Sequence, residues 1–123
     1  MRVLVCGGRD YADVRHVYQV LDLVRPSVVI HGAAPGADTH AGAWARKHNA
    51  EERACPAAWG SFGGAAGPIR NARMLDQHDP QLVIAFLGKD GTEDMVKKAL
   101  AAGVPVLRAE PRKPKSPETL DLF

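Results

Sequence analysis

Three short segments combine glycines with polar side chains in a way that could hold a bound anion. They are Gly7-Gly8-Arg9-Asp10, Gly32 to Asp38, and Gly88-Lys89-Asp90-Gly91-Thr92. A glycine lets a bound group approach the backbone, and the free N–H groups at the start of a following helix attract an anion such as phosphate. One such turn is weak evidence because tight turns need glycine anyway. Three of them at one edge of a small domain would indicate a phosphate-bearing ligand.

The side chains in these turns have both a binding and a structural interpretation. Arg9 could hold a phosphate through two hydrogen bonds, or it could pair with Asp10 or Asp13 at the surface. Asp38 could bind a sugar hydroxyl or cap the helix that follows. The ligand contacts that we predict from the three turns are Gly7, Gly8, Arg9, Asp10, Gly32, Gly36, Ala37, Asp38, Gly88, Gly91 and Thr92.

A fourth segment, Gly67-Pro-Ile-Arg-Asn-Ala-Arg-Met74, places cations at the start of a predicted helix. Arg70 and Asn71 would lie in its first turn, where their donors could join backbone N–H groups around an anion. A cation near a helix N-terminus is mildly unfavourable, so we add both residues to the predicted ligand site. An exposed, solvated helix is the structural alternative.

Other polar residues are more typical of structural roles, or disfavour a highly charged ligand. His31 ends an apolar run and His40 follows it closely, and single histidines of this kind are more often structural. Glu93 and Asp94 would complement the dipole at the start of a helix. Their negative charge disfavours a tightly held polyphosphate at that turn.

The elements that must position these segments alternate along the chain. Short apolar runs predict strands, and apolar residues at three- and four-residue spacing predict the helices between them. Strands are expected at Arg2–Cys6, Ser27–His31, Glu51–Cys55, Gln81–Leu87 and Val104–Leu107, and helices over 13–24, 37–48, 68–77 and 92–102, with a loop over 59–67. The expected inward-facing stripes include Val14, Val17, Tyr18, Leu21 and Val24 in one helix, Ala41, Trp44 and Ala45 in the next, and Met95, Val96, Ala99 and Leu100 in the last.

This alternation predicts a Rossmann-like α/β fold with three layers, α/β/α, around a doubly wound parallel sheet. The simplest order of its five strands is 3-2-1-4-5, and the polar start of residues 51–55 suits an edge strand. Ligands of such sheets bind beyond the carboxyl ends of the strands, where the strand order reverses. That point lies between the first and fourth strands, which lead into the Gly7 and Gly88 turns.

Length and composition exclude several classes of protein. The chain has 123 residues, enough for one domain, which we place at residues 1–108, followed by a basic, proline-rich tail over 109–123. A net charge of +2 gives no reason for nucleic acid as an obligatory partner. No apolar run approaches the roughly 20 residues of a membrane span, and the apolar start reaches Gly7 too soon for a signal peptide, so we expect a cytoplasmic protein. Cys6 and Cys55 lack metal-ligand spacing and are expected to be buried thiols, and no metal or cofactor is predicted.

Several of these motifs together resemble the SLOG superfamily, the Rossmann-like group that contains the cytokinin-activating phosphoribohydrolases and the DNA-processing protein DprA. The runs Cys6-Gly-Gly-Arg-Asp-Tyr11 and Gly32-x-Ala-x-Gly-Ala-Asp38 are most similar to its small YspA-like branch, and the resemblance covers residues 1–108. It implies a pocket for a nucleotide-like ligand, built by the loops after the first and fourth strands, and a homodimer.

The hydrolases of the superfamily that this chain resembles contain Arg-x-x-x-Met followed, after a strand, by Pro-Gly-Gly-x-Gly-Thr-x-x-Glu. The resemblance assigns the chemistry to the arginine and the final glutamate of this motif. Arg70 and Met74 match the first half, but Met95 stands where the glutamate is expected. A thioether cannot replace a carboxylate, and Asp94 points about 100° away around a helix. Arg70, Asp38 and Asp10 remain as candidate catalytic residues.

Two functions from different classes follow from these observations. The first is a module that binds a nucleotide-derived ligand, for example as a sensor, with Trp59 either stacking on the base or packing in the core. The second is a hydrolase or transferase acting on the N-glycosidic bond of a nucleotide. Nucleic-acid binding is not favoured, since the similarity to DprA and the basic tail are its only support.

Overall fold

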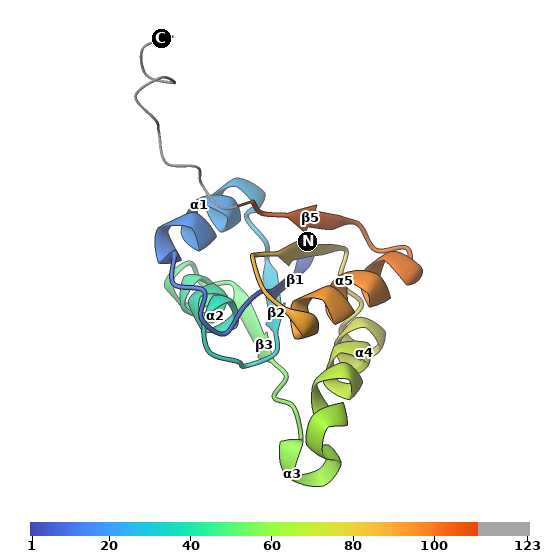
Figure 1. Ribbon diagram of the computed structural model, residues 1–123. Helices are drawn as coiled ribbons and strands as arrows, with labels where there is room; N and C mark the ends of the chain where they lie inside the picture. The colour runs from blue at the N-terminus through green and yellow to red at the C-terminus, as the bar shows by residue number, and fades with distance from the viewer. Residues whose placement is uncertain (111–123) are drawn as a thin grey trace, which may run out of the picture.

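The computed structural model describes residues 1–110, and most of the tail predicted over 109–123 lies outside the described residues. Five parallel strands form a central sheet with helices on both faces (Figure 1). The elements are β1 (Arg2–Cys6), α1 (Val14–Val24), β2 (Val28–His31), α2 (Ala37–Lys47), β3 (Glu51–Ala54), α3 (Trp59–Phe62), a 3-10 turn (Gly63–Ala65), α4 (Ala66–His78), β4 (Leu82–Ala85), α5 (Asp90–Ala101) and β5 (Val106–Arg108).

The strand order is β3-β2-β1-β4-β5, which confirms the predicted Rossmann-like arrangement. β1 lies in the centre, with Val3 opposite Val29 of β2 on one side and Leu82 of β4 on the other. β3 is an edge strand, as its polar sequence predicted. The order of the strands therefore reverses between β1 and β4, so the turns after these two strands leave the sheet side by side.

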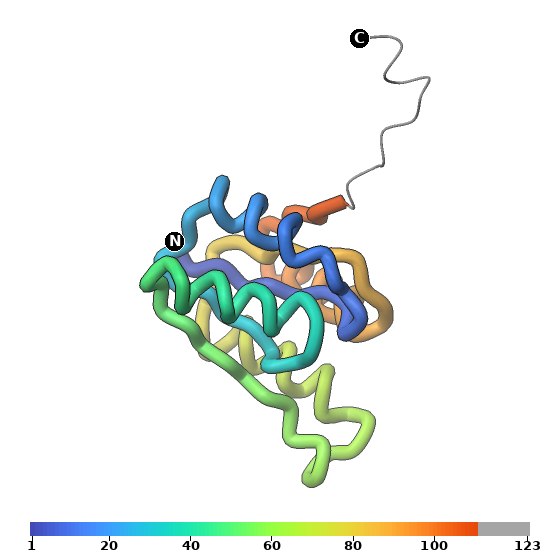
Figure 2. Tube along the Cα trace, turned by 90° about the vertical axis from the view of Figure 1, so that its left-hand side faces the viewer, coloured from blue at the N-terminus to red at the C-terminus, as the bar shows by residue number. Residues whose placement is uncertain are grey.

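Alternate residues of the sheet face two separate apolar cores. One core packs Val3 and Val5 of β1 against α1 and α2, with Phe86 as its largest fully buried side chain. The other packs Leu4 and Cys6 against α4 and α5. Figures 1 and 2 show the two helical layers on opposite faces of the sheet. Both faces of β1 are thus covered, which explains why its sequence is a continuous apolar run.

Residues 59–67 are not the irregular loop that the sequence predicted. Trp59–Phe62 forms α3, Gly63–Ala65 forms a 3-10 turn, and α4 begins at Ala66 rather than at Pro68. α3 projects from the body of the domain and buries none of its residues (Figures 1 and 2). Without a buried face there is no apolar periodicity to read, which is why the helix was missed.

Two residues predicted to face the core are exposed instead. Val14, in the first turn of α1, is 40% exposed, and Leu100, in the last turn of α5, is 60% exposed. Met95, Val96 and Ala99 are buried as predicted. Leu100 is rotated by about 100° from Ala99 around the helix, which carries it off the buried face.

Candidate ligand site at the carboxyl edge of the sheet

The turns after β1, β2 and β4 meet at Gly8. The Gly8 amide donates a hydrogen bond to the carbonyl of Leu87 after β4, at 2.9 Å. Its carbonyl accepts one from the amide of Ala37, the first residue of α2, at 3.3 Å. Three turns distant in sequence therefore converge at the reversal of strand order.

Glycines at this junction allow the turns to pack against each other. A Cβ atom on Gly36 would lie 2.1 Å from the Gly8 carbonyl oxygen, and one on Gly7 would lie 2.6 Å from the Cβ of Ala37. At Gly88 an added Cβ would lie 2.1 Å from Oγ1 of Thr92. The sequence predicts that these glycines let a ligand approach the backbone. In the structure they allow one turn to lie close to another.

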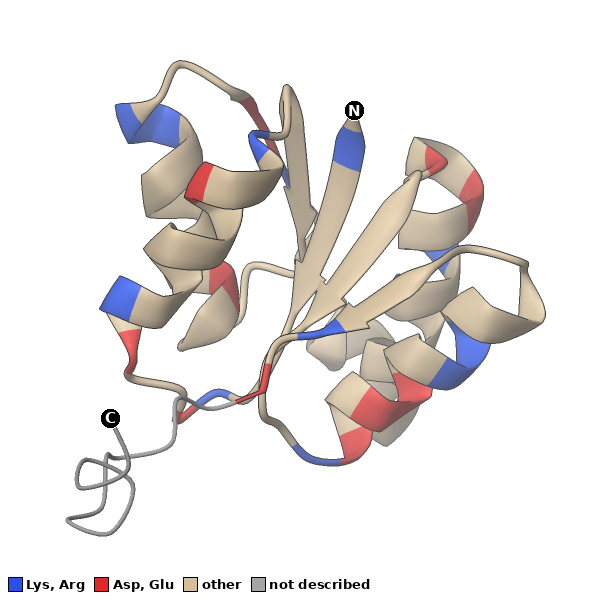
Figure 3. Ribbon diagram, turned by 90° about the horizontal axis from the view of Figure 1, so that it is seen from above, with Lys and Arg blue, Asp and Glu red and all other residues tan. Residues whose placement is uncertain are grey.

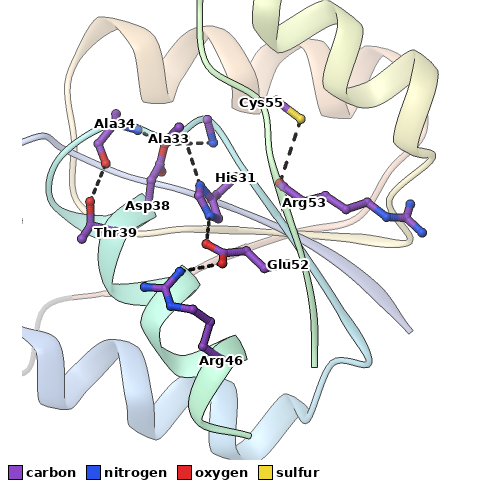
Figure 4. A network of polar contacts seen from close by, with 10 residues as sticks. His31, Ala33, Ala34, Asp38, Thr39, Arg46, Glu52, Arg53 and Cys55 are labelled. Carbon is purple, nitrogen blue, oxygen red and sulfur yellow. Dashed lines mark hydrogen bonds and ion pairs between the residues drawn. The ribbon is translucent and has the colours of Figure 1, made fainter. Parts of the chain in front are cut away.

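The Gly32 turn uses its own backbone donors internally. The carboxylate of Asp38 accepts hydrogen bonds from the amides of Gly32 and Ala34, at 3.0 and 3.3 Å, and the amide of Ala33 donates to Nδ1 of His31 at 3.0 Å (Figure 4). These three N–H groups already have acceptors, so the turn fixes its own shape. Asp38 is 5% exposed, and this burial raises the pKa of its carboxyl above the usual value against the opposing hydrogen bonds.

A prediction about pH follows from the buried carboxyl of Asp38. The Asp38→Asn variant keeps an oxygen that can accept both amide hydrogen bonds and removes the ionisation. Because the folded protein holds the Asp38 proton more tightly than the unfolded chain does, the stability that this linkage contributes is present below about pH 4 and is lost as pH rises through the folded pKa. The free energy of unfolding of the wild type, relative to the variant, should therefore fall as pH rises above about 4, measured by urea titrations at several pH values. A constant or rising difference would contradict the assignment.

His31 links the Gly32 turn to the edge strand. Since its Nδ1 accepts from Ala33, its ring proton is on Nε2, which donates to the carboxylate of Glu52 at 2.7 Å. The hydrogen bond from His31, followed by that from Arg46 at 2.5 Å, holds the pKa of Glu52 below its ordinary value. A Cβ atom on Gly42 would lie 2.2 Å from this carboxylate. Gly42, a glycine in the middle of α2, is the feature of the sequence that could have indicated the close packing of His31 and Glu52 against this helix.

Arg70 and Asn71 lie beyond the first turn of α4, which begins at Ala66, and they connect this helix to the Gly32 turn and to α5. Nη1 of Arg70 donates to the carbonyl of Gly32 at 2.5 Å, and Nε donates to the side-chain oxygen of Asn71 at 2.9 Å. The amide group of Asn71 in turn donates to the carbonyl of Gly91 at 3.2 Å and to Asp94 at 3.0 Å. Asn71 is 4% exposed and its amide is fully used within the protein. It clamps α4 to α5, while Arg70 holds the Gly32 turn.

Arg9 and Asp10 lie on the exposed side of the same edge. The guanidinium carbon of Arg9 is 5.7 Å from the ring centre of Trp59 in α3, and the Trp59 side chain is 48% exposed. The Trp59 ring also lies 3.4 Å from the position of a Cβ on Gly67. Trp59 thus covers the start of α4 rather than packing in either core, and its exposed ring faces the guanidinium of Arg9.

The first half of the chain matches a known protein family. The profile of the family described as YAcAr, the YspA, cpYpsA-related SLOG family, matches residues 1–62, from β1 to the end of α3. The chain belongs to the YAcAr family. It is 35% identical over 118 residues to the Gene 61 protein of Mycobacterium phage D29, covering 86% of this chain and 94% of that protein. Membership of this family and the Rossmann-like fold together suggest a nucleotide-related function.

The hydrolase pattern of the wider superfamily fails in this YAcAr chain for a structural reason. Met95 is fully buried in the core between the sheet and α5, alongside Met74. Asp94 faces α4 instead, and its carboxylate is bound by Asn71 of α4 at 3.0 Å and by Lys98 of its own helix at 2.5 Å. Partial burial opposes ionisation of Asp94, but these hydrogen bonds outweigh it and lower the pKa. The Met95 side chain is therefore enclosed in the core, and the Asp94 carboxylate is already bound by other residues, so neither position supplies a free carboxylate at the Gly8 junction.

The cysteines and the metal and membrane predictions can be compared with residues 1–110. Cys6 and Cys55 are both free. Cys6 is buried as predicted, and burial raises its pKa to about 12, whereas Cys55 is only partly buried, contrary to the prediction. Among the described residues no group of three or more His, Cys, Asp or Glu side chains could hold a metal ion, and no described helix could span a membrane. The homodimer, the cytoplasmic location and the ligand contacts stay predictions for this YAcAr protein.

Proposed function

We propose that this protein binds a nucleoside monophosphate, or a related nucleotide-derived ligand, at the carboxyl edge of the sheet and acts as a sensor module. The meeting of three turns at Gly8 carries the proposal, because it gathers the β1, β2 and β4 exits at one point. Open parallel sheets bind ligands at this point of reversed strand order.

Two helix starts add backbone donors at this edge. α2 and α5 begin at Ala37 and Asp90, and no side chain caps the start of either helix. The amide of Ala37 already donates to the Gly8 carbonyl, so the donors meant in α2 are those of the residues after Ala37. The first N–H groups of a helix have no partner within it and attract anions. A phosphate above Gly8 would use donors of this kind, with the guanidinium of Arg9 beside it.

The charges around α5 favour a ligand with few phosphates. Asp90 and Glu93 lie in the first turn of this helix, and Figure 3 shows acidic residues along its first turns. Glu93 is bound by both terminal nitrogens of Arg108, at 2.9 and 3.0 Å, which leaves only part of the negative charge balanced. A monophosphate meets less repulsion here than a triphosphate would, and the exposed face of Trp59 supplies a surface on which a base can stack.

The test is binding of AMP by isothermal titration calorimetry. Arg9→Gln should weaken AMP affinity by about ten-fold or more, because a guanidinium–phosphate contact is a charge-assisted hydrogen bond. Arg25→Gln is the matched control, since Arg25 is an exposed arginine after α1, at the opposite edge of the sheet. Absence of AMP binding, or equal losses in the two variants, would refute the proposal.

A second candidate function, cleavage of the N-glycosidic bond, is favoured by the juxtaposition of Asp38 and Arg70. Both side chains bind the backbone of Gly32, and burial raises the pKa of Asp38 above its ordinary value, the direction that favours the protonated form of a general acid. Incubation with AMP, ADP-ribose or NAD and detection of the free base tests it. Turnover that is lost in Asp38→Asn and Arg70→Gln would establish an enzyme, whereas binding without turnover would leave the sensor.

A further inference from the structure

A separate cavity lies between α4 and the segment that leaves β3. It has a volume of about 240 Å³, and its wall includes Cys55, Phe62, Arg70, Arg73, Gln77 and His78. The volume corresponds to roughly eight water molecules. β2 separates β3 from β1 in the sheet, so this cavity lies to one side of the Gly8 junction. Arg70 is shared with the second candidate function, and the rest of the cavity wall has no part in the functions proposed above.

The charged residues that line this cavity are all basic. Arg70 and Arg73 are three apart on α4, so their charges repel across neighbouring turns of the helix. The partners of Arg70 are uncharged carbonyls and the Asn71 amide, and the guanidinium carbon of Arg73 lies 5.7 Å from the ring centre of Phe62. Within residues 1–110 neither arginine forms an ion pair with a carboxylate.

The carboxylate that acts on His78 in this wall is already paired. Glu51 of β3 is the carboxylate that acts on His78, and it is bound by the guanidinium of Arg53. Arg70 interacts electrostatically with the carboxylate of Asp38 on its far side, whereas Arg73 has no carboxylate partner among the described ion pairs. An anion that enters the cavity would therefore meet two guanidinium groups, of which that of Arg73 has its charge unbalanced. Two arginines suit the dianionic charge and the several oxygens of a phosphate group.

The remaining wall of the cavity is apolar. Pro56, Phe62, Ile69 and Met74 line it, and these side chains suit the carbon skeleton of a small ligand rather than a bare ion. We propose that this cavity is a second ligand site that binds a small phosphate monoester such as a sugar phosphate. The phosphate contacts Arg70 and Arg73, and the carbon skeleton packs against Phe62 and Ile69.

The thiol of Cys55 provides a reporter inside the cavity. Its Sγ atom lies 3.3 Å from Nε2 of His78, and the residue is only partly buried. Cys6 is 8% exposed, and burial raises its pKa to about 12, so it should react far more slowly with an alkylating reagent. The rate of single alkylation by iodoacetamide, followed by mass spectrometry, therefore measures access to the cavity.

The experiment uses the full chain and ribose 5-phosphate as the probe. Saturating probe should slow alkylation of Cys55 several-fold, and Arg73→Gln should raise the concentration for half-protection about ten-fold. Arg73 is exposed, so this variant should fold as the wild type does. Lys97→Gln, which removes an exposed cation on α5, and Arg9→Gln should both leave protection unchanged.

Three outcomes would overturn the second site. They are no protection by ribose 5-phosphate, protection that Arg73→Gln leaves intact, and equal protection by inorganic phosphate, which would show that the cavity does not recognise an ester. The AMP titration of Arg9→Gln reports on the Gly8 junction alone, so failure of one site can be distinguished from failure of the other.

Discussion

Replacing Gly36 by alanine is expected to lower the free energy of unfolding by about 3–5 kcal/mol. Gly36 has φ +81°, a conformation that L-residues rarely adopt, and its added Cβ would lie 2.1 Å from the backbone oxygen of Gly8. A backbone atom cannot move aside as a flexible side chain can. The turns after β1 and β2 would have to separate, and with them the junction at which we place the ligand. Urea unfolding followed by far-UV circular dichroism measures the loss.

Gly60→Ala is the matched control for this effect. Gly60 lies in α3, its φ is not positive, and an added Cβ would meet nothing within 4 Å. This variant should be unchanged or more stable by up to about 1 kcal/mol, since alanine is the better helix former. If Gly36→Ala were as stable as the wild type, the close contact between the two turns would be wrong. If both variants lost stability equally, the effect would not be specific to the junction.

Replacing Met95 by glutamate should destabilise the fold by about 3–5 kcal/mol at neutral pH and should not create a hydrolase. The substitution restores the residue of the superfamily's hydrolase pattern, but position 95 is fully buried among apolar side chains. An unpaired carboxylate there loses its hydration without gaining a partner. Its pKa in the folded state would rise, so the destabilisation should grow as pH increases above about 4 and be smallest where the group is protonated in both states.

Met95→Leu controls for the change in shape. It keeps the volume and the apolar character of the side chain, so it should cost less than about 1.5 kcal/mol and show no added dependence on pH. Urea titrations of the two variants across the pH range, together with an assay for free base released from AMP, complete the test. A Met95→Glu protein with wild-type stability and release of base would show that position 95 faces the ligand site, contrary to the structure.

The sequence was sufficient for the architecture because burial leaves a local pattern. Arg2–Cys6 is apolar on both faces of the sheet, whereas Glu51–Ala54 is polar, and these two patterns predict the buried and the edge strand that the structure has. The helices that cover the sheet were found by their apolar stripes for the same reason. α3 was missed because it buries no residue and therefore has no stripe.

The tertiary structure alone decided which groups meet at the candidate sites. Glycines near Gly8 could be read as room for a ligand, but only the distance between Gly36 and Gly8 shows that they let two turns touch. Hydrogen bonds such as that from His31 to Glu52, which are 21 residues apart, depend on the crossovers between strands. They leave no periodic pattern in the amino-acid sequence. The cavity beside Arg73 exists because α3 and α4 fold back past the end of β3. Local sequence records which residues are buried and where the chain turns, and the packing of distant segments determines the partners that those residues have.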